Sequence, residues 1–191
     1  MIELDNIREF ALEKPTGWNS FGSPEDYLNM PDEHRDQILF LDRTANKYLY
    51  EYLESIKLLT GPIWNPFEKG NFRTIEEFTN MDDSSELKKW LYNRGIPFQN
   101  WVLMLPNYHE DPVLLTWKMV VKYSPDIFFQ LDDIVIFDKS NNWCLFYFHE
   151  EHLFFGKDNI YDPEIGYQEV AELYELRKKF PKFKHPLLPD K

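Results

Sequence analysis

Residues 143–156, WCLFYFHEEHLFFG, hold the side chains of this chain that are best suited to chemistry. Two aromatic and aliphatic runs flank four polar residues, His149, Glu150, Glu151 and His152. Paired histidines are typical of a metal site, because neutral imidazole is a common metal ligand, and a glutamate beside a histidine suits general acid–base catalysis. A short polar segment between two apolar runs is also typical of a turn between strands. The motif therefore allows three interpretations: a metal site, a catalytic pair or a turn.

The metal interpretation requires the two imidazoles to converge. In the helical zinc-protease signature the histidines are four residues apart, whereas His149 and His152 are three apart and their flanking runs favour strands. If the two glutamates form a two-residue turn, the histidines face each other across the ladder. A third ligand must then come from elsewhere, for example His109, Asp132 or Asp133. A metal-assisted hydrolase that uses His149 and His152 is therefore an open alternative; no other cofactor is expected.

The catalytic interpretation is no better supported than the metal interpretation. Adjacent glutamates diverge in most turns, and a catalytic carboxylate needs a partly buried position that shifts its pKa, whereas a hairpin tip is usually hydrated. Cys144 lies in an apolar run, which favours a buried and inert thiol, and as the only cysteine it has no disulfide partner within the chain. No P-loop, dinucleotide fingerprint or G-x-S-x-G elbow occurs. The sequence therefore favours a turn, and no enzymatic activity is expected.

Hydrophobic spacing predicts the elements that position this motif. Residues 1–95 are predicted to be mainly helical. Apolar residues recur at three- and four-residue steps between Ile38 and Ile56, which predicts a helix of about 25 residues from Pro31. Further helices are predicted to start at Ser23, Thr74 and Ser84.

Residues 100–156 are predicted to contain strands and one longer helix. The expected strands are 101–105, 134–137, 143–148 and 153–155, and a helix is expected from Asp111 to about Tyr123, with one more turn from Ser124. A C-terminal helix at 162–180 and a basic tail at 181–191 complete the chain. The predicted fold is a single α+β domain over residues 1–191, in which a helical N-terminal half packs on a small antiparallel sheet with a C-terminal helix.

The charge of the chain restricts its partners. The formal net charge is −12, and a protein this acidic repels nucleic-acid phosphates and anionic membrane surfaces. Residues 177–191 carry +5, which leaves −17 on the rest. Their RKKFPKFK segment combines basic and stacking residues, but the −17 opposes nucleic-acid binding; docking of the tail on an acidic partner is a further alternative. With no apolar run of about 18–20 residues and no signal-peptide pattern, a cytoplasmic protein is expected.

Acidic residues concentrate around the predicted sheet. Between residues 132 and 164, eight acids stand against two lysines and alternate with aromatic residues that include Trp143 and Tyr147. Charge steers a basic partner toward such a surface, and exposed aromatic side chains supply buried anchors in the complex. We expect a protein partner to contact Asp132, Asp133, Glu150, Glu151 and Asp158, with Tyr161 as an anchor.

Residues 134–156, IVIFDKSNNWCLFYFHEEHLFFG, resemble a segment of bacterial immunity proteins and of related uncharacterised bacterial families. The shared features are a strand, a polar turn, a strand that starts with tryptophan, a histidine-acidic turn and an aromatic-glycine ending. Small, acidic, aromatic-rich cytoplasmic proteins of this kind belong to polymorphic-toxin and contact-dependent growth-inhibition systems. The resemblance implies a one-to-one complex with a cognate toxin, often a nuclease, and no catalysis. It assigns no individual residue, because the class varies most at its binding surface.

Overall fold

The computed structural model describes residues 2–13, 19–58, 67, 70–106, 111–130, 133–161, 163–182 and 184. The chain forms two compact units, Met1–Asn159 and Ile160–Lys191. The second unit contains helix α7, Pro163–Lys179, which confirms the C-terminal helix predicted from the sequence.

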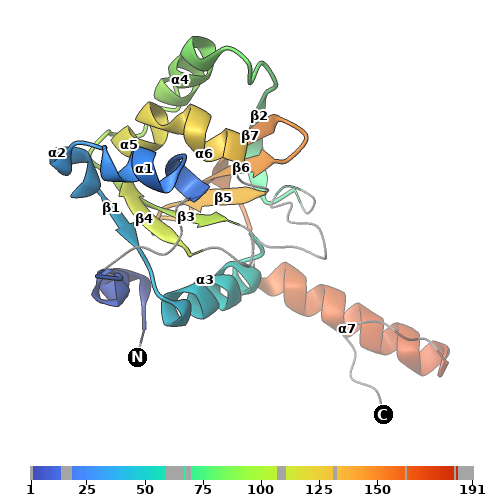
Figure 1. Cartoon of the computed structure of the whole chain (residues 1–191). Coiled ribbons are helices and arrows are strands. Elements are labelled where there is room, and N and C mark those ends of the chain that lie inside the picture. The colour runs from blue at the N-terminus through green and yellow to red at the C-terminus, as the bar shows by residue number, and fades with distance from the viewer. Residues whose placement is uncertain are drawn as a thin grey trace. The chain divides into compact units, whose positions relative to one another are not determined.

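The first unit is built on an antiparallel sheet (Figure 1). Among the described residues seven strands pair in the order β1-β4-β3-β5-β6-β7-β2, and every neighbouring pair is antiparallel. Their bounds are β1 Ile38–Phe40, β2 Phe72–Phe78, β3 Trp101–Pro106, β4 Val113–Thr116, β5 Ile134–Phe137, β6 Trp143–Phe148 and β7 His152–Asn159. The fold is therefore α+β, but its strands are not confined to the second half of the chain, because β1 and β2 form the two edges of the sheet.

Helices cover both faces of this sheet (Figure 1). One face packs against α1, α4, α5 and α6, and the other packs against α3 and the 3-10 helix η1. The bounds are η1 Leu4–Phe10, η2 Asn19–Phe21, α1 Pro24–Leu28, α2 Asp32–Arg35, α3 Arg43–Ser55, α4 Ser84–Tyr92, α5 Trp117–Lys122 and α6 Ser124–Gln130. The central strands are buried on both faces, which explains their solid apolar runs.

The long helix predicted from Pro31 is wrong in its first half. Ile38 pairs with Leu115 in β4, so this part of the apolar pattern belongs to strand β1. Helix α3 begins only at Arg43, because the Asp42 side chain caps it and accepts a hydrogen bond of 2.9 Å from the Ala45 main-chain N–H. Its apolar residues Ala45, Leu49 and Leu53 are fully buried against the sheet.

Two other predicted helices are strands. Residues 74–77, expected to start a helix, lie in β2 and pair with β7. The segment after Asp111 forms β4, whose four residues are all buried between β1 and β3, and the helix starts only at Trp117. The predicted strands at 101–105, 134–137, 143–148 and 153–155 are confirmed, as are the helices that start near Ser23 and Ser84. No helix among the described residues combines the length and the apolar composition needed to cross a membrane.

Candidate functional site

The HEEH segment is the turn between β6 and β7, as the sequence favoured. Phe148 pairs with His152, which leaves three residues, 149–151, in the turn. Glu151 adopts the left-handed conformation with φ +65°, a common ending for a three-residue hairpin loop. The two-residue turn with facing histidines that the metal interpretation required does not form, because the cross-strand neighbour of His152 is Phe148 and not His149.

Each histidine of the turn contacts its own carboxylate. The His149 main-chain N–H donates to Asp133 Oδ1 at 3.1 Å, and its Nδ1 lies 2.8 Å from the same oxygen. His152 Nδ1 lies 2.7 Å from Glu77 Oε1 on β2. Across the residues that the structure describes, no three His, Cys, Asp or Glu side chains come together in a way that could hold a metal ion. His109 and Asp132, named as possible further ligands, lie outside the described residues, so the metal alternative depends on them.

The topology gathers carboxylates at the end of the sheet that carries this turn. At that end β2 and β6 finish while β5 and β7 begin, so Asp133, the turn residues and Glu77 near the end of β2 lie there together. Residues 74–87 contain five acids and no basic residue. We name this surface the acidic end; it comprises Glu77, Asp133, Glu150 and Glu151. All of these except half-buried Asp133 are exposed.

The structure separates the predicted contact residues. Asp133, Glu150 and Glu151 belong to the acidic end, but Asp158 lies six residues after His152, about 20 Å along β7 toward the opposite end of the sheet. Asp132 lies outside the described residues, and Tyr161 belongs to the second unit. Glu77 was missed because its segment was predicted to be a helix; the run of acids without a basic residue was the available signal.

The expected exposed aromatics on β6 are buried instead. Trp143 and Tyr147 are only 7% and 4% exposed, because β6 is an interior strand with both faces covered. Trp143 stacks on Phe155, and its indole N–H donates to Asp138 Oδ2 at 2.9 Å.

Other aromatic rings reach the acidic end. Phe148 and Phe154 are half-buried there, on the sheet face opposite to Trp143. The ring centroids of Phe148 and His149 are 4.3 Å apart, and His152 stacks on Phe154 at 6.0 Å. The two imidazoles thus form the outer layer of an aromatic cluster, which we define as Phe148, His149, His152 and Phe154.

A pocket of about 520 Å³ lies at the opposite end of the sheet, between η1, the start of β3 and the β5–β6 turn. The Arg8 guanidinium lies 3.8 Å from the centroid of the Trp101 ring, and Lys139 pairs with Asp5 at 3.2 Å. The turn histidines do not line this pocket. The acid–base groups of the motif and this concave surface are therefore separated by the length of the sheet.

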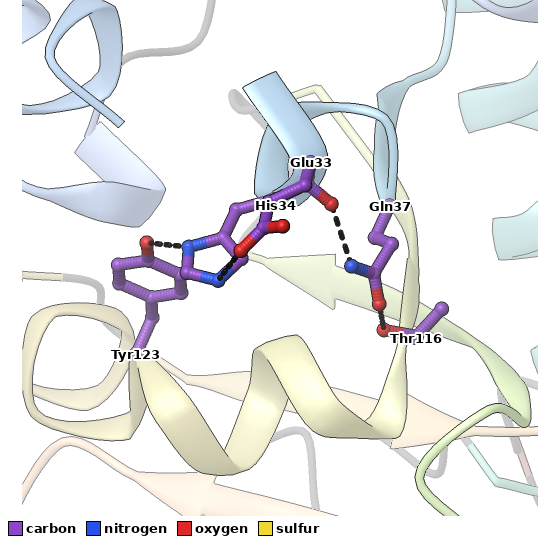
Figure 2. Close-up of polar contacts among 5 residues, drawn as sticks. All are labelled: Glu33, His34, Gln37, Thr116 and Tyr123. Carbon is purple, nitrogen blue, oxygen red and sulfur yellow. Dashed lines mark hydrogen bonds and ion pairs between the residues drawn. The ribbon is translucent and has the colours of Figure 1, made fainter. Parts of the chain in front are cut away.

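A second polar cluster, which the sequence did not predict, joins α2 to β4 and α5 (Figure 2). His34 Nδ1 lies 2.8 Å from the Tyr123 hydroxyl, and His34 Nε2 lies 3.7 Å from Glu33 Oε1. The Gln37 amide donates to the Glu33 carbonyl at 2.6 Å and accepts from the Thr116 hydroxyl at 3.0 Å. These contacts connect segments that are about 80–90 residues apart in sequence, as expected of a polar network inside a fold.

The surroundings of His34 favour its neutral imidazole. Its side chain is buried, and burial together with the nearby positive charges of Lys122 and Lys118 lowers the pKa of His34, more than Glu33 raises it. A neutral imidazole that carries its proton on Nε2, toward the Glu33 carboxylate, accepts a hydrogen bond from the Tyr123 hydroxyl at Nδ1. The cluster therefore links α2 and Gln37 to the segment from Thr116 to Tyr123.

No protein-family model matches this sequence, and no curated protein matches it. The resemblance to immunity proteins therefore stays a prediction from the residues.

Proposed function

We propose that this protein is a cytoplasmic immunity-type inhibitor, which binds a basic toxin in a one-to-one complex and covers its functional surface. The observation that carries the proposal is the acidic end itself. Carboxylates from three separate segments lie at one end of an antiparallel sheet, beside a half-buried aromatic cluster. Charge at such a surface accelerates the encounter with a basic partner, and desolvated aromatic rings supply the anchoring contacts.

The scaffold favours tight binding. The turn is held by the 148–152 pairing and by the contact of His149 with Asp133, so the acidic groups are positioned before a partner arrives. A preorganised surface loses less conformational freedom on association. A nuclease fits the partner best, because an enzyme that binds phosphates carries the basic surface that these carboxylates would cover.

The first test is capture of the tagged protein from its native cells, with mass spectrometry of what it retains. The proposal expects a stoichiometric basic protein that arrests growth when it is expressed without this chain. Recovery of the chain alone would contradict the proposal and move attention to His149 and His152, with elemental analysis of untagged protein as the next measurement.

The second test uses the captured partner to locate the binding surface on this chain. Reversal of two exposed charges in Glu150→Lys/Glu151→Lys is expected to weaken binding at low salt by about tenfold or more, mainly through the association rate. The matched control, Glu9→Lys/Glu13→Lys, makes the same charge change at exposed positions on η1 and just after it, next to the β1 edge and away from the acidic end. Equal losses of affinity in the two variants would show that net charge, and not the acidic end, determines binding.

A further inference from the structure

The two edge strands of the sheet, β1 and β2, differ in whether another segment pairs with their outer side. At β1, the Leu12 main-chain N–H donates to the Phe40 carbonyl at 2.8 Å and the Asp42 N–H donates to the Phe10 carbonyl at 2.9 Å. A bridge between Ala11 and Leu41 completes this contact, so the N-terminal segment closes the β1 edge.

The outer side of β2, by contrast, has no partner strand among the residues that the structure describes. β2 pairs with β7 on one side, and no main-chain hydrogen bond between described residues joins its other side to a further segment. Residues 73–77 are all exposed, although strand side chains alternate between the two faces of a sheet. These side chains are accessible although Arg94, which follows α4, pairs with Glu76 at 2.6 Å on one face of the sheet. An exposed edge strand is a template for pairing with another strand.

The exposed residues of β2 are complementary to themselves. Their order is Arg73-Thr74-Ile75-Glu76-Glu77, with Ile75 at the centre and opposite charges two positions away on either side. When two such strands pair antiparallel about a twofold axis at Ile75, each Arg73 lies opposite Glu77 of the other copy and the two Ile75 side chains meet. Directly opposite pairs on one face of an antiparallel ladder are the pairs that stabilise a sheet.

Neighbouring registers lose this complementarity. A shift of one residue places Ile75 opposite Glu76, and a shift of two toward the C-terminus places Glu76 opposite Glu76, which like-charge repulsion disfavours. Ile75 is 44% exposed, which leaves apolar surface in contact with water. Contact with Ile75 of the other copy buries this surface. Glu77 contacts His152 through Oε1, so its second carboxylate oxygen can accept from a guanidinium.

We propose that a second copy of this chain docks on the outer edge of β2, and that the two sheets join into one continuous sheet across the twofold axis. The contact is isologous, since the same five residues serve both copies. Pairing over these residues adds about four to six main-chain hydrogen bonds. Assembly stops at two copies, because the other edge of each sheet, at β1, is already closed by residues 10–12.

The test exchanges the charges of the proposed pair. In Arg73→Glu, the introduced carboxylate faces Glu77 of the other copy; in Glu77→Arg, the introduced guanidinium faces Arg73 of the other copy. Sedimentation velocity over a concentration series is expected to show a dimer for the wild-type chain and a dimer at least about tenfold weaker for each variant. Mixed in equal amounts, the two variants are expected to form a heterodimer. In it, each of the two charge pairs joins a glutamate of one variant with an arginine of the other.

Only folded variants can form a heterodimer, so the mixture distinguishes a lost charge pair from a folding defect. Circular dichroism of each variant checks its fold. A wild-type chain that stays monomeric at the highest concentration would overturn the proposal. So would variants that dimerise like the wild type, or a mixture that stays monomeric. None of these outcomes depends on a toxin, so this inference and the proposed inhibitor function succeed or fail separately.

Discussion

Replacement of Gly156 by alanine is expected to destabilise the fold through packing and not through backbone strain. Gly156 lies in β7 opposite Ile75 and Cys144, without a left-handed backbone. A Cβ at this position would lie 2.4 Å from Phe67 Cε1 and 2.6 Å from Phe72 Cγ. Non-bonded carbons pack at about 3.5–4.0 Å, so each ring must move by roughly 1 Å.

The size of the effect follows from these contacts. Phe67 and Phe72 pack against each other with ring centroids 5.4 Å apart, and Phe72 is buried at the start of β2. Overpacking of a filled core costs about 1–3 kcal/mol, and two rings have to yield here. We expect the free energy of unfolding to fall by about 2–3 kcal/mol, which lowers Tm by roughly 5–10 °C for a unit of this size.

Urea unfolding followed by tryptophan fluorescence measures this change. A double-mutant cycle with Phe67→Ala removes the nearest clashing ring, so a coupling of about 1 kcal/mol or more is expected between the two sites. Gly95→Ala is the matched control: its φ of +73° strains alanine by about 1–2 kcal/mol, but nothing lies within 4 Å of the added Cβ. A Gly156→Ala protein within about 0.5 kcal/mol of wild type, or strict additivity with Phe67→Ala, would refute the reasoning.

Three further predictions concern single groups. Because burial and neighbouring lysines lower the pKa of His34, the stability it provides is complete above its unfolded pKa of about 6.5 and is lost as pH falls through its folded pKa. The fall of unfolding free energy between pH 7 and 5 should therefore be shallower in His34→Gln, by at most about 1.4 kcal/mol per pH unit; equal slopes would contradict the assignment. Burial raises the pKa of the Cys144 thiol, so a disulfide reagent at pH 8 should label one thiol in urea and none in the folded protein. Asp83 accepts from the N–H groups of Ser85 and Glu86, so Asp83→Ala should lose about 1 kcal/mol of unfolding free energy and Asp83→Asn much less.

The elements predicted correctly from the sequence are those whose local residue pattern fits only one type of secondary structure. Residues 134–137 and 143–148 are buried on both faces of the sheet, and their continuous apolar runs between turn residues favoured strands. Ile38 was assigned to a helix because its spacing to Leu41 and Ala45 fits a helical face. Its pairing partner Leu115 lies 77 positions away, and local spacing contains no information about it. Asp42 before Arg-Thr-Ala was the local sign of the true helix start.

The candidate site shows the same limit. Counting acids along the chain identified Asp133, Glu150 and Glu151, but position in the chain does not tell which end of a sheet a residue occupies, so Asp158 was grouped with them. Glu77 was missed because β2 is exposed on both faces, and a strand of this kind has no alternation of apolar and polar residues to reveal it. The burial of Trp143 likewise depends on the helices packed over β6, which no local pattern specifies.

The placement of β2 beside β7 determines when this fold can be completed during synthesis. Paired residues of the two strands are 75 to 87 positions apart, and β2 comes first. At about 5–20 residues per second, β2 leaves the ribosome roughly 4–17 s before its pairing partner exists. The carboxylates of Glu76 and Glu77 keep that waiting segment hydrated and discourage pairing between neighbouring nascent chains in shifted registers. A product that terminates before residue 152 lacks β7, so its β2 segment has no strand to pair with and stays accessible to proteases. Synthesis of β7, the last strand of the sheet, is therefore the step that protects β2 from degradation.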